Sequence, residues 1–138
     1  MNPSQSSIYR DLELLMQWYL PIGNKIAKDL PGEQAIHNLG NSFQQDLIDA
    51  MRSCRIALKL RGKKAKTQED IDALCEAIDL ITYHLEGCSS VFDIMNEYKS
   101  GEGPIVSDVQ FANYLERIAS LKKQIGGWRG KTASQILK

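Results

Sequence analysis

Apolar side chains recur at steps of three and four residues over four long segments of this chain, at about 7–29, 33–60, 67–95 and 107–125. This spacing gathers them along one side of an α-helix. No stretch of useful length alternates apolar and polar residues as a half-buried strand does. Loop-forming sequences separate the segments, which disfavours a single long coiled coil. The sequence therefore predicts an all-α fold, an antiparallel up-down-up-down four-helix bundle.

Single residues mark where these helices should begin or bend. Pro21 lies inside the first segment and should kink it, because proline lacks the backbone N–H. Thr67 and Asp70 form a variant of the capping box at the start of the third segment, and Ser107 or Asp108 should cap the fourth. In the fourth segment the expected core residues are Phe111, Leu115, Ile118, Leu121 and Ile125.

Length and composition predict one globular domain over residues 1–138, with an ordered bundle at about 7–129 and a flexible tail at 130–138. No apolar run approaches the roughly 20 residues of a membrane span. The first residues lack the pattern of a secretory signal, so the expected location is cytoplasmic. Cys54, Cys75 and Cys88 are scattered and form no CxxC pair, so we expect buried free thiols.

The charges balance overall, with 17 Lys and Arg against 17 Asp and Glu, but they are strongly segregated along the chain. Residues 50–68 carry seven basic side chains and no acidic one. Residues 69–116 carry eleven acidic side chains and one basic one. Net charges of −3 at 1–49 and +6 at 117–138 complete the balance.

In an up-down bundle the loop between the second and third helices lies at the same end as both termini. That end should be basic, and the opposite end should be acidic through Asp29, Glu33, Glu97, Glu102 and Asp108. The candidate nucleic-acid-binding residues belong to the basic end and to the helices that lead to it: Arg52, Arg55, Lys59, Arg61, Lys63, Lys64, Lys66, Lys122, Lys123, Arg129 and Lys131.

Three interpretations of this basic surface remain open. It suits the phosphate backbone of a nucleic acid. It also suits an acidic protein partner, such as the third helix of another copy, and it is compatible with a solvated face that has no specific partner. Because no aromatic residues are interleaved with the basic ones, RNA would be recognised by its shape and backbone, with little reading of bases.

The patterns that enzymes built on helical bundles need are missing or misplaced. Neither His37 nor His84 follows a Glu at the spacing of a di-iron site, nor an Arg at the spacing of a helical-bundle ribonuclease. No glycine-rich phosphate loop is present. Asp72, Glu76 and Asp79 share a helical face that could hold magnesium, but this face lies opposite the apolar side. We expect no catalytic residues, no metal site and no cofactor.

Three stretches together resemble a known family: "YLPIGNKIAKDLP" at 19–31, "FQQDLIDAMRSCRIALKL" at 43–60 and "IGGWRGK" at 125–131. The combination is similar to the accessory variability determinant proteins of diversity-generating retroelements. It is also similar to their relatives, the four-helix-bundle proteins encoded in rRNA intervening sequences. The similarity extends over about residues 8–131.

The resemblance implies a non-enzymatic accessory protein that forms a homopentamer. Such a protein would bind a reverse transcriptase and structured template RNA, or its hybrid with cDNA, and would support mutagenic cDNA synthesis. Arg52, Arg55, Lys59, Arg129 and Lys131 fall where the family places similar charge. Family members are strongly basic whereas this chain is neutral, which gives more weight to charged contacts between subunits or with the polymerase.

Some apolar residues lie outside the main apolar sides. Leu14, Trp18, Ala73 and Ile94 are expected to exceed what one four-helix core can cover, which predicts a homo-oligomer. Trp128 follows two glycines near the end of the last segment, and we expect its ring to pack back onto the bundle or a neighbouring subunit.

Overall fold

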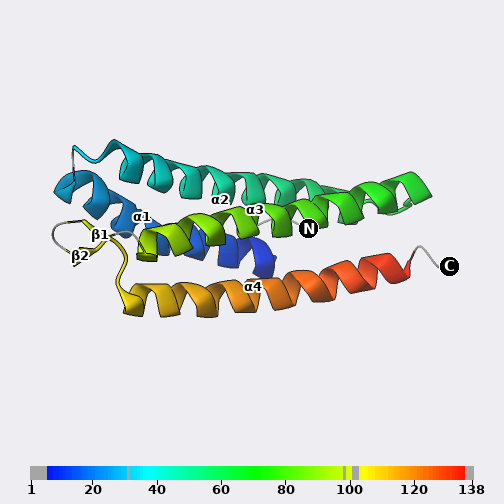
Figure 1. Ribbon diagram of the computed structural model, residues 1–138. Helices are drawn as coiled ribbons and strands as arrows, with labels where there is room; N and C mark the ends of the chain where they lie inside the picture. The colour runs from blue at the N-terminus through cyan, green and yellow to red at the C-terminus, as the bar shows by residue number, and fades with distance from the viewer. Residues whose placement is uncertain (1–5, 31, 98, 101–102, 136–138) are drawn as a thin grey trace.

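The computed structural model describes residues 6–30, 32–97, 99–100 and 103–135, which form four helices and one short hairpin (Figure 1). The helices are α1 (Ser7–Asp29), α2 (Gln34–Arg61), α3 (Gln68–Glu97) and α4 (Asp108–Ser134). Between α3 and α4, strands β1 (Lys99–Ser100) and β2 (Gly103–Pro104) pair antiparallel. The predicted all-α four-helix bundle is confirmed.

Each helix runs opposite to the one before it, as the colours in Figure 1 show. Hydrogen bonds between α1 and α2 agree with this direction. Arg55 Nε donates to Tyr9 Oη (2.8 Å), and Tyr19 Oη donates to the Gly40 carbonyl (3.2 Å). The start of α1 therefore lies beside the end of α2. Among the described residues, no helix is long and apolar enough to cross a membrane.

Part of the core is a cluster of aromatic rings to which all four helices contribute. Tyr19 stacks on Phe43 with 4.2 Å between ring centroids, Phe43 tilts against Phe92 at 5.4 Å, and Phe92 stacks on Tyr114 at 4.4 Å. All four side chains are almost completely buried. Burial disfavours the phenolate and raises the pKa of Tyr19 to about 12. Such rings stabilise a core through both their large buried area and their mutual packing.

The fourth helix turns a different residue into the core than the sequence predicted. Leu115, expected inside, is 49% exposed, and Tyr114 is fully buried. Tyr114 stacks on Phe92 and shares a hydrogen bond with Ser89 (2.8 Å between the two oxygens). Because this hydroxyl finds a partner inside the bundle, the larger tyrosine ring can be buried without an unsatisfied polar group.

The helix starts follow the predicted capping patterns. At α3, Thr67 Oγ1 accepts from the Asp70 amide, and the Asp70 carboxylate accepts from the Thr67 amide, both at 3.1 Å. The Thr67 amide and the Lys63 ammonium lower the pKa of Asp70. At α4, Ser107 is the N-cap and forms a capping box with Gln110. Of the two candidates for the fourth cap, the structure selects Ser107.

The bundle extends further toward the C-terminus than the sequence predicted. Helix α4 continues to Ser134, past residue 129 where the sequence predicted that the ordered bundle ends and a flexible tail begins. Residues 136–138 of that expectation lie outside the described residues. Trp128 packs against the core, and buried Thr132 donates its hydroxyl to the Trp128 carbonyl (2.9 Å). These contacts hold the helix together beyond Gly126 and Gly127.

Two further expectations concern helix α1 and the thiols. Pro21 lies within α1, which continues to Asp29. Cys54, Cys75 and Cys88 are free and buried, as predicted. Burial raises the pKa of the Cys54 thiol to about 12 and also raises that of Cys88. These two thiols are small apolar core groups under ordinary conditions.

Candidate nucleic-acid interface

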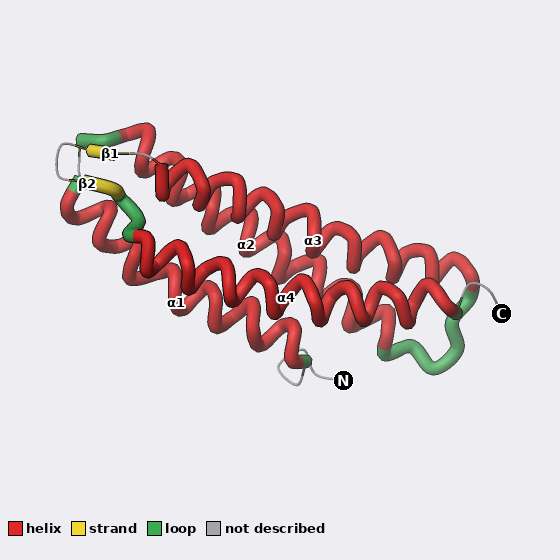
Figure 2. Tube along the Cα trace, turned by 60° about the horizontal axis from the view of Figure 1, so that its bottom comes forward, coloured by secondary structure: helices red, strands yellow, loops and turns green. Residues whose placement is uncertain are grey.

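The basic residues of the α2–α3 loop and of the end of α4 meet at one end of the bundle, which we call the basic pole. Figure 2 shows this loop near the C-terminal end of α4, with the β1–β2 hairpin at the opposite end. Helix α1 begins short of this end, so that α2, α3 and α4 continue past its first residues (Figure 1). The chain therefore builds the basic pole from three helices and the loop.

A cavity of about 780 Å³ lies at the basic pole, beside the first residues of α1. Its apolar wall is formed by Ile8, Leu74 and Trp128. Cationic side chains from the end of α2, the α2–α3 loop and α4 line the rest, together with polar residues at the start of α1. These cationic residues are Arg61, Lys66, Lys123 and Lys131.

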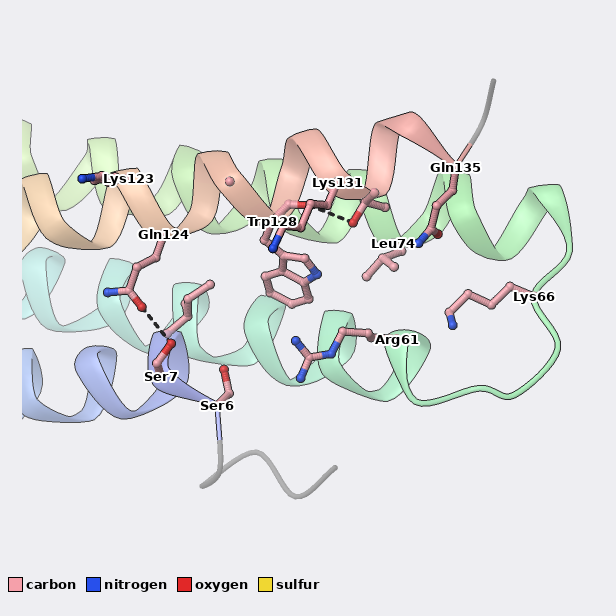
Figure 3. A pocket seen from close by; sticks show the side chains of 13 residues that line it. Ser6, Ser7, Arg61, Lys66, Leu74, Lys123, Gln124, Trp128, Lys131 and Gln135 are labelled. Carbon is pink, nitrogen blue, oxygen red and sulfur yellow. Dashed lines mark hydrogen bonds between the residues drawn. The ribbon is translucent and has the colours of Figure 1, made fainter. Parts of the chain in front are cut away.

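Two side chains that line the cavity, Arg61 and Trp128, contact each other although they are far apart in the sequence. The guanidinium carbon of Arg61 lies 5.2 Å from the centroid of the Trp128 ring. Figure 3 shows the Trp128 ring pointing from α4 toward Arg61 on α2, with Lys66 reaching in from the loop. An arginine over an indole face is an attractive cation–π arrangement. The predicted packing of Trp128 onto the bundle is confirmed, and the ring also forms part of the basic pole.

The three loop lysines are not equivalent. Lys63 forms an ion pair with Asp70 (3.1 Å), and Lys66 donates from Nζ to the Lys63 carbonyl (3.0 Å). Lys64 is exposed. Lys63 and Lys66 therefore help to shape the loop as well as adding positive charge.

The candidate residues Arg52, Arg55 and Lys59 form a basic stripe on α2 that leads away from the basic pole, along the flank next to α1. Arg55 lies over the Tyr9 ring, 5.2 Å from its centroid, in addition to its hydrogen bond to the Tyr9 hydroxyl. Arg52 is near Asp49 (3.7 Å), and Lys59 is exposed. On α4, Lys122 and Lys123 are exposed, and Lys123 lies at the edge of the cavity.

Arg129 does not join the cations around the cavity. Its Nε and Nη2 donate to the two carboxylate oxygens of Asp79 (2.8 and 3.3 Å), and Nη1 donates to Cys75 Sγ (3.3 Å). The hydrogen bond to Asp79 raises the pKa of Arg129 further. The guanidinium thus lies on the acidic outer face of α3, where Asp79 neutralises its charge.

The acidic triplet of α3 lies on that outer face, as the sequence predicted. Asp72, Glu76 and Asp79 are all exposed, and Arg129 occupies the carboxylate of Asp79. An exposed triplet with one member already paired has little of the enclosure that a catalytic magnesium site uses.

The fold also brings together a group that the sequence did not predict. Asp46 and Asp49 of α2 and His84 of α3 have ligand-type atoms within 4.8 Å of one another and are half-buried. Burial, followed by the neighbouring Asp49, raises the pKa of Asp46, while His84 opposes this shift. These residues could contact a divalent cation, but Asp49 also accepts from Gln45 (3.1 Å). Only the antiparallel pairing of α2 and α3 reveals the group.

Comparison of the chain with protein-family models, with curated proteins and with solved structures finds no match in any of the three. The geometry of the basic pole therefore carries the functional argument.

Proposed function

We propose that this protein is a non-enzymatic accessory subunit that binds structured RNA through its basic pole. In this proposal it also binds a reverse transcriptase and supports mutagenic cDNA synthesis in a diversity-generating retroelement. The proposal of RNA binding is supported by the positive charge of the basic pole. The retroelement and the reverse transcriptase rest on the resemblance of three sequence stretches to the accessory variability determinant family.

The observation that carries the proposal is the convergence of cations at one end of a neutral protein. Lys64, Lys123 and Lys131 are exposed there and come from two separate parts of the chain. A polyanion that contacts them releases condensed counterions, which favours binding at low salt. The exposed acidic face of α3 would repel the same polyanion, so the charge distribution orients the RNA toward the basic pole.

The salt dependence of RNA binding tests the proposal. If about four phosphates are neutralised, a plot of log affinity against log salt has a slope of about −3. The measurement is fluorescence anisotropy of a labelled RNA stem-loop between about 50 and 300 mM salt.

A matched pair of variants locates the binding surface. Lys123→Glu with Lys131→Glu changes the charge at the basic pole, whereas Lys25→Glu with Lys28→Glu makes the same change near the far end of α1. We expect the first pair to weaken binding on the order of tenfold or more at about 0.1 M salt. The second pair should have a much smaller effect. Equal effects of the two pairs, with both proteins folded by circular dichroism, would refute the proposed surface.

A second candidate function is a protein-interaction bundle that acts through assembly and has no nucleic-acid partner. Apolar side chains on the outer faces favour it, since Tyr83 on α3 is 69% exposed and Ile56 on α2 is 57% exposed. Leu14 and Ile94, predicted to exceed the core, are 41% and 46% exposed. In a head-to-tail ring, one face of each subunit contacts a different face of the next subunit. The acidic residues around Tyr83 on one subunit would complement the basic stripe beside Ile56 on its neighbour.

Sedimentation velocity at micromolar concentration tests this assembly. We expect an oligomer, a homopentamer according to the family resemblance, that Ile56→Glu or Tyr83→Glu dissociates. Val109→Glu is the control. Val109 lies in the first turn of α4, at the end of the bundle opposite to the basic pole, and its side chain is apolar and 72% exposed. A wild-type protein that sediments only as a monomer would contradict the assembly. An oligomer that binds no RNA would favour the second candidate.

A further inference from the structure

The cavity at the basic pole differs in kind from the exposed lysines around it. An exposed lysine serves any phosphate, but the cavity adds an indole ring and the aliphatic side chains of Ile8 and Leu74 among the cations. Its volume of about 780 Å³ lies within the usual range of about 300–1,000 Å³ for small-ligand pockets. A site of this composition suits a ligand that is flat and apolar on one part and anionic on another.

An RNA duplex presents only phosphates, hydroxyl groups and base edges, because its base faces are stacked inside the helix. An unpaired nucleotide exposes its base face next to its phosphate. Proteins bind such bases by stacking them on aromatic rings or on the plane of an arginine guanidinium. Trp128 and Arg61 supply both kinds of surface at one place, since the guanidinium carbon lies over the indole ring, 5.2 Å from its centroid.

We infer that the cavity binds one unpaired nucleotide of an RNA, with the base against the Trp128–Arg61 pair and the phosphate near Lys66 and Lys131. This inference rests on the proposed RNA-binding function and adds to it the kind of RNA. The sequence predicted recognition of RNA shape and backbone with little reading of bases, because no aromatic residues are interleaved with the basic ones. The fold supplies an aromatic residue from α4, 67 positions after Arg61 in a chain of 138 residues.

Two neighbouring glycines of α4 offer a matched pair of variants that leaves Trp128 in place. Gly127 lines the cavity, whereas Gly126 does not. Apart from its chain neighbours and the backbone of its own helix turn, a Cβ atom at either position would meet no described atom within 4 Å, so there is space for a side chain at both. Gly127→Leu should fill part of the cavity, and Gly126→Leu should place the same side chain outside it.

The experiment compares two RNAs of equal length, a stem-loop with unpaired nucleotides and a fully paired duplex. We expect the wild type to bind the stem-loop about tenfold more tightly than the duplex, within the range for one stacked base. Gly127→Leu should remove this preference without weakening duplex binding, and Gly126→Leu should retain it. A Trp18→Phe background leaves Trp128 as the sole tryptophan, whose fluorescence should be quenched by the stem-loop and not by the duplex.

The possible failures are distinct. If both RNAs bind equally in a salt-dependent way and Trp128 fluorescence does not change, the inference is wrong and the proposed function stands. The same holds if Gly127→Leu and Gly126→Leu behave alike. If neither RNA binds at about 0.1 M salt, both ideas are wrong. Quenching of Trp128 by an acidic peptide of Glu and Leu, with no RNA binding, would assign the cavity to a protein partner.

Discussion

Helix α3 contains a glycine whose replacement should reveal how closely α2 and α3 are packed. A Cβ atom at Gly87 would lie 2.7 Å from Asp46 Oδ2, 2.9 Å from Cγ and 3.1 Å from Oδ1. All three distances are shorter than ordinary contacts and two are below 3.0 Å, so the Asp46 carboxylate must move. It has little room, because it is half-buried beside Asp49 and His84.

Two opposing effects set the magnitude for Gly87→Ala. Alanine is favoured over glycine in a helix by about 1 kcal/mol. Overpacking of a well-filled site costs about 1–3 kcal/mol, and we take about 2 kcal/mol because only one short side chain has to shift. The expected net loss is therefore about 1 kcal/mol. For a domain of this size that corresponds to a fall in Tm of about 3 °C.

Two further variants separate these effects. Gly126→Ala should stabilise the protein by about 1 kcal/mol, since no atom lies within 4 Å of the new Cβ. In an Asp46→Ala background, Gly87→Ala should also become stabilising, which gives a coupling energy of about 2 kcal/mol. Urea denaturation followed by circular dichroism measures all of these changes. If Gly87→Ala stabilises the wild type as much as Gly126→Ala does, the close contact with Asp46 is wrong.

Three other predictions follow from the core and from the titrating groups. Tyr114→Ala should lower the free energy of unfolding by about 3–5 kcal/mol, whereas Leu115→Ala should change it by less than about 0.5 kcal/mol in the same urea assay; comparable losses would contradict the observed face of α4. The fold raises the pKa of Asp46 above its ordinary value of 3.8, so ionisation of this group costs stability as the pH rises through the folded pKa. Asp46→Asn should therefore raise Tm at pH 7, with a gain that shrinks toward pH 4, and a constant gain would contradict this cause. Cys54 and Cys88 should react with a thiol reagent at pH 8 only as fast as the protein unfolds, and rapid labelling of either in the native protein would show that it is not buried.

Local sequence patterns were sufficient to predict the four helices and most of their buried sides. Apolar spacing and caps are local properties, and the first helix shows this clearly. Its apolar residues at steps of three and four are all buried: Ile8, Leu12, Leu15, Tyr19, Ile22 and Ile26. The basic pole was also predictable. Short connections force neighbouring helices to run in opposite directions, and this places the α2–α3 loop at the same end as the end of α4.

Packing between the helices selects which of several locally equivalent side chains contact each other. Tyr114 and Leu115 are adjacent and both apolar in part, and contacts with Phe92 and Ser89 on α3 help to place the tyrosine in the core. Arg129 appeared from its neighbours to be one more cation of the basic pole, but Asp79, 50 positions earlier, pairs with it.

The cavity at the basic pole was likewise outside the reach of local patterns. It lies between the first residues of α1 and the parts of α2 and α4 that extend past them, and Leu74 and Trp128 form part of its wall. Arg61 and Trp128 meet only because α2 and α4 both extend past that point. Helical periodicity fixes the direction of a side chain around its own axis. It does not fix how far each helix reaches along its neighbours, and this relative reach creates the site.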